Sequence, residues 1–362
     1  MNLDFSYKIP YSLKELKENM NIAYSILKKK HKNNYKFARA IFGSWYCSIR
    51  DCKFCFLSTQ KNAKIFVSKR TIESIIAEAL IIKKLNAKLQ DFTGGVLGND
   101  YSELVKLTKL LYHIFEKQIW INLNVVPLKV WDEIKNYVEG LVYSTETFNK
   151  KLHDFVAPSK PLENSFKVFD FLDSEKKKKG VTLIIGLGET WKDIKVTNEF
   201  IETWQIDQIH LYGLKPIKGT IYENKVIPPL PYILFWISEL RINNPKLLIS
   251  ASKSYKYINE YPFFYKAGAN YYSKLRFLHY FGRKGFRYFQ YLNNKLNIKQ
   301  ETIVFMNKEE FNDFREELIN YDIEKLEKKS DTEINKDLFY KKLNEYLGLM
   351  ERNISNGLKN YR

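Results

Sequence analysis

The sequence predicts an α/β protein: a closed (β/α)8 barrel with an N-terminal helix before it and a C-terminal helical extension after it. Three observations support this fold class. Short apolar segments of strand type alternate with amphipathic segments of about ten to fifteen residues, which is the pattern of parallel βαβ units. About eight such units follow one another, which favours a closed barrel over an open sheet. The pattern ends near Phe286, and the remaining chain is charged with helical periodicity.

Each expected element has a local reason. Ser12 can cap a first helix, because apolar residues from Leu13 to Leu27 recur at helical spacing. The strand segments are short, apolar and bounded by turn residues: 40–45, 89–93, 119–123, 140–143, 181–186, 208–212, 247–251 and 269–272. We expect helices over 71–85, 102–111 with Ser102 as its cap, 163–172, 191–204 and 230–242, and another after Pro127.

The chain divides into three predicted segments. Residues 1–36 form a helical preface, 37–285 the barrel and 286–362 the helical extension. Within the extension we expect helices over 308–318 and 337–350, with 325–336 as a solvated linker. The extension either packs on the barrel or forms a homodimer contact.

Composition and charge limit the class of protein. The chain has 362 residues, of which 45% are hydrophobic and 28% charged, as in an ordinary soluble globular protein. No apolar run is long enough to span a bilayer and the N-terminus lacks a signal-peptide layout, so we expect a cytoplasmic protein without membrane contact. The net charge of +18 would suit nucleic acid, but the lysines are spread over most predicted helices. An anionic small-molecule substrate fits this charge equally well, and RNA is the less favoured partner.

The cysteines give the strongest chemical signal. All three, Cys47, Cys52 and Cys55, fall within nine residues after the first predicted strand. Their odd number and short spacing argue against disulfides, and a structural zinc site usually needs a fourth ligand, for which no histidine is suitably close. Three thiolates on one loop suit a [4Fe–4S] cluster, with the fourth iron open to a substrate or cofactor. An accidental cluster and an incomplete zinc site remain the alternatives.

This loop resembles that of the radical S-adenosylmethionine (SAM) enzymes. Their usual spacing is C-x3-C-x2-C with an aromatic residue before the last cysteine, here Phe54. The present motif is C-x4-C-x2-C, with one extra residue in its first gap. The resemblance implies a [4Fe–4S] cluster, SAM, an oxygen-poor reducing compartment and an external electron donor such as ferredoxin or flavodoxin.

Further segments resemble the biotin synthase, HydE and pyrrolysine-mutase group in the same order. The resemblance implies that Gly94 and Gly95 hold the amino group of SAM and that Glu146 accepts from a ribose hydroxyl or an ammonium. In HydE-like members a basic residue downstream holds the SAM carboxylate; the matching position is Ser165, so Lys167 is the candidate for this role. The remaining cofactor contacts that the resemblance implies are Ile184, Gly186 and Leu211.

Other segments are matched less specifically. Glu189 is expected to order the loop that follows Gly186, and Arg241 with residues 268–270 matches the same group further along the chain. His210 and Tyr212 lie on one face of the sixth predicted strand, where they either contact substrate or pack as core residues.

The resemblance implies reductive cleavage of SAM to a 5′-deoxyadenosyl radical. Biotin synthase needs a second cluster with further cysteines, and this chain has no other cysteine. Radical SAM proteins linked to the iron-guanylylpyridinol cofactor of [Fe]-hydrogenase are among those with an unusual first gap in the cysteine motif. Synthesis of the pyridinol part of that cofactor is therefore our specific hypothesis. The alternatives are a HydE-like, mutase-like or RNA-modifying radical SAM enzyme, and a non-catalytic protein that binds metal or RNA.

Overall fold

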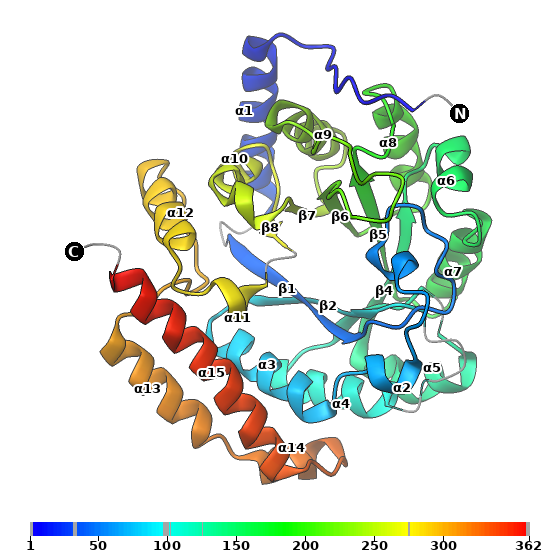
Figure 1. The fold of residues 1–362 in the computed structure, drawn as a ribbon. Coiled ribbons are helices and arrows are strands. Elements are labelled where there is room, and N and C mark those ends of the chain that lie inside the picture. Colours follow the sequence, from blue (N-terminus) through cyan, green and yellow to red (C-terminus); the bar gives the residue numbers. More distant parts are fainter. Residues whose placement is uncertain are drawn as a thin grey trace.

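The computed structural model describes residues 3–31, 35–96, 101, 103–124, 126–273 and 276–359. Within these ranges eight parallel strands form a closed barrel, in which each strand pairs with the next and β8 returns to β1 (Figure 1). The strands are β1 (Lys36–Ser44), β2 (Lys88–Gly94), β3 (Ile119–Asn122), β4 (Val138–Glu146), β5 (Lys178–Ile185), β6 (Gln208–Gly213), β7 (Leu248–Ser252) and β8 (Tyr271–Tyr272). The predicted fold class is confirmed.

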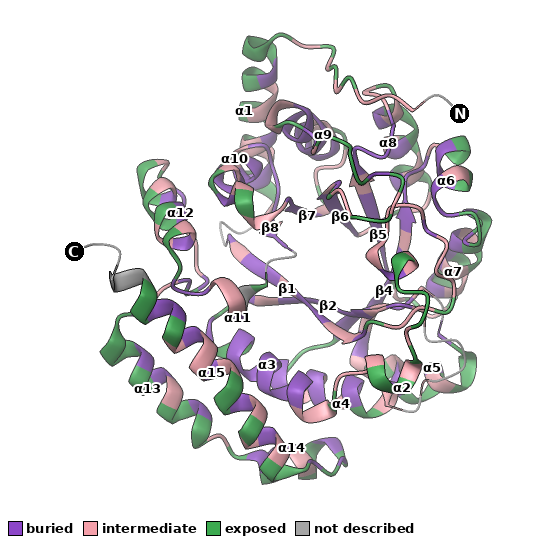
Figure 2. Ribbon diagram, in the orientation of Figure 1, coloured by how far each residue is buried: buried purple, intermediate pink, exposed green. Residues whose placement is uncertain are grey.

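An outer layer of helices surrounds the strands, and it buries the apolar faces of both layers between them (Figure 2). The helices are α2 (Ile65–Ser68), α3 (Ile72–Lys84), α4 (Leu104–Phe115), α5 (Leu128–Ile134), α6 (Lys150–Val156), α7 (Glu163–Ser174), α8 (Asp193–Thr203), α9 (Leu230–Asn243), α10 (Tyr261–Lys266) and α11 (Phe277–Tyr280). The predicted helices are present with ends shifted by a few residues. Ser102, the expected cap of α4, lies outside the described residues.

The N-terminal helix α1 (Leu13–Lys30) begins as predicted. The Ser12 hydroxyl accepts from the Glu15 amide at 3.3 Å, and the Glu15 carboxylate accepts from the Ser12 amide at 2.7 Å, a reciprocal cap. Helix α1 packs on α9. The α9 residue Arg241 is fully buried and donates to the Gly268 carbonyl at 3.0 Å and to the Asn270 side chain at 2.6 Å. The Asn270 side chain also accepts from the Ile249 amide of β7 at 2.9 Å, so these residues link α9, β7 and the turn before β8.

The C-terminal extension contains α12 (Lys284–Lys295), α13 (Lys308–Ile319), α14 (Ile323–Ser330) and α15 (Lys336–Lys359). It packs on the barrel, since α15 lies along α3 and α14 contacts α4 (Figure 1). The Tyr346 hydroxyl lies 2.8 Å from that of Ser74 on α3. The prediction of a solvated linker over 325–336 is wrong for its first part, which belongs to helix α14. Ile323 and Leu326 bury one face of this helix, and its lysines are exposed.

Across the part of the chain that the structure describes, no helix is both long enough and apolar enough to cross a bilayer.

Candidate functional site

The cysteine loop lies across the carboxyl end of the barrel, directly after β1. Two backbone hydrogen bonds fix it there: the Ser48 amide donates to the Val96 carbonyl at 2.8 Å, and the Lys53 amide to the Val156 carbonyl at 2.9 Å. The loop is therefore tied to the end of β2 on one side and to α6 on the other. In a (β/α)8 barrel this end carries the active site.

Arg50 organises the first gap of the cysteine motif. Its backbone is left-handed, with φ of 52°, which turns the chain sharply between Cys47 and Cys52. Its guanidinium donates to the carbonyls of Cys47, Lys61 and Ala63, each at 2.6 Å. One side chain thus holds both the turn and the segment that follows the last cysteine.

The two glycines at the end of β2 have different surroundings. A Cβ on Gly95 would overlap the Tyr46 carbonyl oxygen and lie 2.7 Å from the Cβ of Cys47. A Cβ on Gly94 would meet nothing closer than 3.5 Å. Gly95 is therefore required by the close approach of the cysteine loop, whatever it binds.

The cysteines lie in a small apolar cluster. Cys52 is buried with Leu187, Leu214 and Tyr222, and the half-buried Phe54, Cys55 and Ile184 pack against the same cluster. Four predicted site residues from two segments, Cys52, Phe54, Cys55 and Ile184, therefore meet at one place. Burial raises the pKa of the Cys52 thiol to about 12, and the neighbouring Lys160 opposes this shift.

The three thiols are free and are close enough for charge on Cys47 to affect the pKa of Cys55. Among the described residues, however, no three His, Cys, Asp or Glu side chains are placed to hold one metal ion. A single ion needs its ligands around one point, whereas each cysteine of a [4Fe–4S] site ligates a different iron. The set of three free thiols beside apolar side chains fits such a cluster in its chemistry.

A buried ion pair lies beside the loop. Lys160 Nζ is 2.9 Å from Oε1 of Glu146, and the exposed fractions of the two side chains are 7% and 8%. Glu146 ends β4 with a left-handed backbone, φ 63°, and Oε2 accepts from the Thr182 hydroxyl at 3.4 Å. Burial alone would lower the pKa of Lys160, but the Glu146 carboxylate raises it above its ordinary value. The lysine is therefore an ammonium, charged beside Cys52.

Lys160 was missed in the sequence, and Lys167 was named in its place. Lys167 is exposed on α7, on the solvent side of the helix layer, which corrects that assignment. Ser165, the position matched to the family's basic residue, is buried and donates to the Leu162 carbonyl at 2.6 Å. One feature of the sequence could have indicated Lys160: it lies between Pro158 and Pro161, whose rings restrict the backbone of the turn after α6 and so fix the position of this lysine.

His153 connects this lysine to the strand. Its ring is fully buried, with Nδ1 2.6 Å from the Thr145 carbonyl and Nε2 2.6 Å from the Lys160 carbonyl. The imidazole thus fixes the loop that carries Lys160 against the end of β4, next to Glu146.

The loop after β5 is built around Glu189. Its carboxylate accepts from the amide of Gly186 at 2.7 Å and from that of Gly188 at 3.2 Å, so Glu189 orders this loop as expected. Burial raises the pKa of Glu189 to about 7, and these backbone amides act against that shift. Gly186 has φ of 106°, and a Cβ there would lie 2.6 Å from Pro228 Cγ. Any side chain at Gly186 would therefore disturb the loop.

Polar side chains fill the inside of the barrel. Gln90 Nε2 on β2 lies 3.0 Å from His210 Nδ1 and 2.6 Å from the Tyr212 hydroxyl on β6. Since β2 and β6 are not neighbours, these contacts cross the lumen. Asp91 Oδ2 is 3.2 Å from His210 Nδ1. The inside of the barrel is therefore lined with buried polar side chains.

The alternation along β6 corrects one predicted contact. His210 and Tyr212 face the lumen, so the side chain of Leu211 between them faces the helices, where it is buried in the apolar core. Leu211 can offer only its backbone to a ligand inside the barrel. In the described chain, Gln90 Oε1 and the Ser250 hydroxyl are buried without hydrogen-bond partners, which leaves polar atoms available to a ligand.

Fold and site together define a (β/α)8-barrel protein whose functional loops gather around a cysteine motif at the carboxyl ends of the strands. The profile of the Radical SAM superfamily matches residues 46–201, a segment that contains all three cysteines. This segment is therefore a domain of the radical SAM superfamily. The cofactors of this family are a [4Fe–4S] cluster and SAM, as the cysteine motif predicted.

Two relatives share sequence with the chain. It is 36% identical over 245 residues to the uncharacterized protein MJ0597 of Methanocaldococcus jannaschii, over 66% of each chain. It is 28% identical over 198 residues to the biotin synthase of Thermodesulfovibrio yellowstonii, over 50% of this chain and 58% of that one. The matches thus span only 66% and 58% of these relatives' own lengths.

Solved structures share the fold. Methylornithine synthase (PylB) superposes with a TM-score of 0.62 at 20% identity, over 73% of this chain and 78% of its own. The [FeFe]-hydrogenase maturase HydG of Carboxydothermus hydrogenoformans gives 0.63 at 13% identity, over 96% of this chain and 87% of its own. At these identities the likeness shows the fold alone.

Proposed function

We propose that the chain reductively cleaves SAM at a [4Fe–4S] cluster held by Cys47, Cys52 and Cys55. The observation that carries this proposal is their common loop across the carboxyl end of the barrel, within the segment that matches the family. When bound, the cluster and SAM together supply a 5′-deoxyadenosyl radical that abstracts hydrogen from a substrate. The residues around the cysteine loop would bind SAM and the substrate.

The neighbouring loops are suited to hold SAM. The backbone at Gly94 and Gly95 is next to the cysteine loop and offers polar atoms to the amino group. Glu146 is a hydrogen-bond acceptor for a ribose hydroxyl or an ammonium, and its partner Lys160, in place of Lys167, is the cation for a carboxylate. Ile184 and Gly186 would offer an apolar side chain and close backbone to adenine, and Phe54 would lie beside the cluster, since it packs with the cysteines.

The polar lumen supports a small-molecule substrate bound below the cysteine loop. Gln90, His210 and Tyr212 present donors and acceptors, and burial in the lumen keeps water from a reactive radical. Such groups suit a compact ring that carries hydroxyl or carboxylate substituents. A pyridinol precursor of the iron-guanylylpyridinol cofactor is our specific candidate, with ferredoxin or flavodoxin as electron donor.

Anaerobic reconstitution tests the activity. Wild-type chain supplied with iron, sulfide, dithionite and SAM should release 5′-deoxyadenosine, and should show the absorbance of an iron–sulfur cluster. The triple variant Cys47→Ala/Cys52→Ala/Cys55→Ala should do neither. Release of no 5′-deoxyadenosine by a fully reconstituted wild type, or tight binding of zinc alone, would reject the proposal in favour of a binding protein.

The substrate class is tested separately. Pyridinol precursors should accelerate 5′-deoxyadenosine release and be converted to product by wild type. Tyr212→Phe should lower that acceleration more than it lowers substrate-free cleavage of SAM, because the hydroxyl contacts Gln90 inside the lumen. If the precursors have no effect while SAM is still cleaved, the pyridinol substrate is rejected and the proposal of a SAM-cleaving enzyme is retained.

A further inference from the structure

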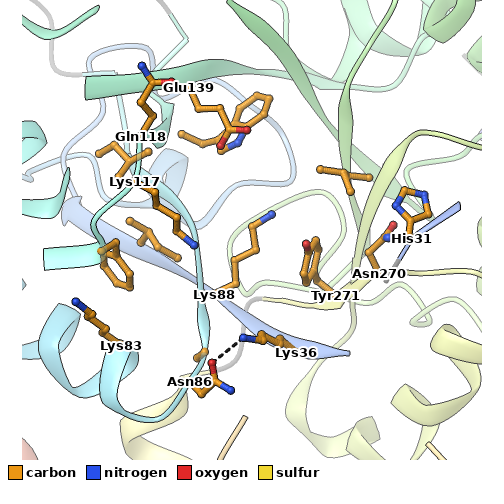
Figure 3. A pocket seen from close by; sticks show the side chains of 16 residues that line it. His31, Lys36, Lys83, Asn86, Lys88, Lys117, Gln118, Glu139, Asn270 and Tyr271 are labelled. Atoms are coloured by element: carbon orange, nitrogen blue, oxygen red, sulfur yellow. Dashed lines mark hydrogen bonds between the residues drawn. The ribbon is translucent and has the colours of Figure 1, made fainter. Parts of the chain in front are cut away.

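A cavity of about 540 Å³ opens at the amino-terminal end of the barrel (Figure 3). It is lined by the first residues of β1, β2, β3, β4, β7 and β8. The cysteine loop follows the opposite end of β1, so this cavity is not part of the site described above. The volume is in the range of pockets that hold small molecules.

The lining is strongly basic. Lys36, Lys83, Lys88 and Lys117 contribute to it, and Glu139 is the acidic residue in the described lining. Figure 3 shows the amino groups of Lys88 and Lys117 reaching into the same space from β2 and from the turn before β3. Partial burial lowers the pKa of Lys117, the charges of Lys88 and Lys36 lower it further, and the Glu139 carboxylate opposes this shift.

Part of this charge is already compensated. Lys36 donates to Asn86 at 2.6 Å and lies 3.2 Å from Glu301. The Glu139 carboxylate is engaged by Lys178 at 2.8 Å.

For Lys88 and Lys117 the compensation is only long-range, from the charge of Glu139, which raises both pKa values. Nothing in the described ranges forms an ion pair with either, and the ammonium of Lys88 lies 4.0 Å from the centre of the Tyr271 ring. Burial lowers the pKa of Lys88 to about 8. A half-buried ammonium without a direct counter-ion, next to a second ammonium, is unfavourable, and a bound anion would relieve both the desolvation of Lys88 and the repulsion.

We propose that this cavity binds a small multivalent anion of the pyrophosphate type between Lys88 and Lys117. Lysine binds phosphate as a point charge, and two lysines without carboxylate partners match two phosphoryl groups. The amides of Asn86 and Gln118 and the Tyr271 hydroxyl line the same space and can hydrogen-bond phosphoryl oxygens. This anion would bind at the amino-terminal end of the barrel, far from the cysteine loop at the other end. Its binding to the folded chain would therefore stabilise the fold without contacting the cofactors.

Calorimetric titration of the full chain with pyrophosphate, in phosphate-free buffer at constant ionic strength, tests the proposal. We expect one saturable site, weakened about ten-fold or more in Lys88→Met and in Lys117→Met. Lys117 is exposed at the rim, so its variant should fold even if the Lys88 variant does not. Pyrophosphate should raise the melting temperature of wild type more than that of either variant.

The matched control is Lys129→Met/Lys195→Met. Both lysines are exposed on helices outside the cavity, and their loss exceeds the charge change of either single variant. This control should bind pyrophosphate like wild type. Absence of a saturable site in wild type, or equal weakening in the control, would overturn the proposal.

Discussion

The ammonium of Lys160 lies 2.9 Å from the carboxylate of Glu146, and both groups are buried at the mouth of the barrel. The pair joins the end of β4 to the loop after α6, and His153 bonds to the backbone on both sides of the same junction. Because Glu146 also has left-handed backbone, the end of β4 is held in a conformation that an isolated strand would avoid.

Lys160→Met tests the contribution of this pair to stability. We expect the free energy of unfolding of the cofactor-free chain to fall by about 3–5 kcal/mol, because a buried carboxylate loses its counter-ion. Urea unfolding measures the change. Adding Glu146→Gln should recover most of the loss, and a double variant no more stable than Lys160→Met would show that the pair is not the cause.

Gly95→Ala and Gly94→Ala form a matched pair. The methyl group at Gly95 would overlap the Tyr46 carbonyl, whereas the one at Gly94 has ordinary van der Waals room. We expect Gly95→Ala to destabilise the chain by about 1–3 kcal/mol, in the range for overpacking, and to lower its iron content after reconstitution. Gly94→Ala should melt like wild type. Equal melting temperatures for the two variants would contradict the packing described here.

Arg50→Ala should loosen the cysteine loop without unfolding the barrel. The variant loses three hydrogen bonds from one guanidinium, each with a contribution on the order of 1 kcal/mol. All three bonds lie within the cysteine loop and the segment after it, so their loss should open this loop locally without unfolding the barrel. We therefore expect iron and sulfide per chain to fall while the melting temperature of the cofactor-free chain changes little. Arg50→Lys keeps the charge but cannot reach three carbonyls, so its iron content should be intermediate; wild-type loading in both would exclude this role.

Glu189 should make stability depend on pH. Burial raises the pKa of Glu189 from 4.5 to about 7, so the folded chain keeps a proton that the unfolded chain releases. The corresponding stability is complete below about pH 4.5 and is lost as the pH rises to about 7. From about pH 5 to about pH 8, wild type should lose about 2–3 kcal/mol relative to Glu189→Gln in urea unfolding. Parallel pH profiles would show that Glu189 titrates normally.

The fold was predictable because its signals are local. Apolar strands and amphipathic helices alternate along the chain. Each strand pairs with the next strand in sequence, so the order of strands in the chain is their order in the barrel. The prediction failed where charged residues dominate a short helix: α14 was expected to be part of a linker because its lysines outnumber its two apolar residues, Ile323 and Leu326.

The sequence by itself determined the barrel and the cysteine loop at its mouth, because both depend on neighbours along the chain. Only the tertiary structure decided that Glu146 pairs with Lys160 and not with a residue on α7, and that Leu211 faces away from the lumen. It also brought Lys88 and Lys117 to one cavity from separate segments. Such pairings depend on strand register and on which turns approach in space, and neither property is encoded in the spacing of residues.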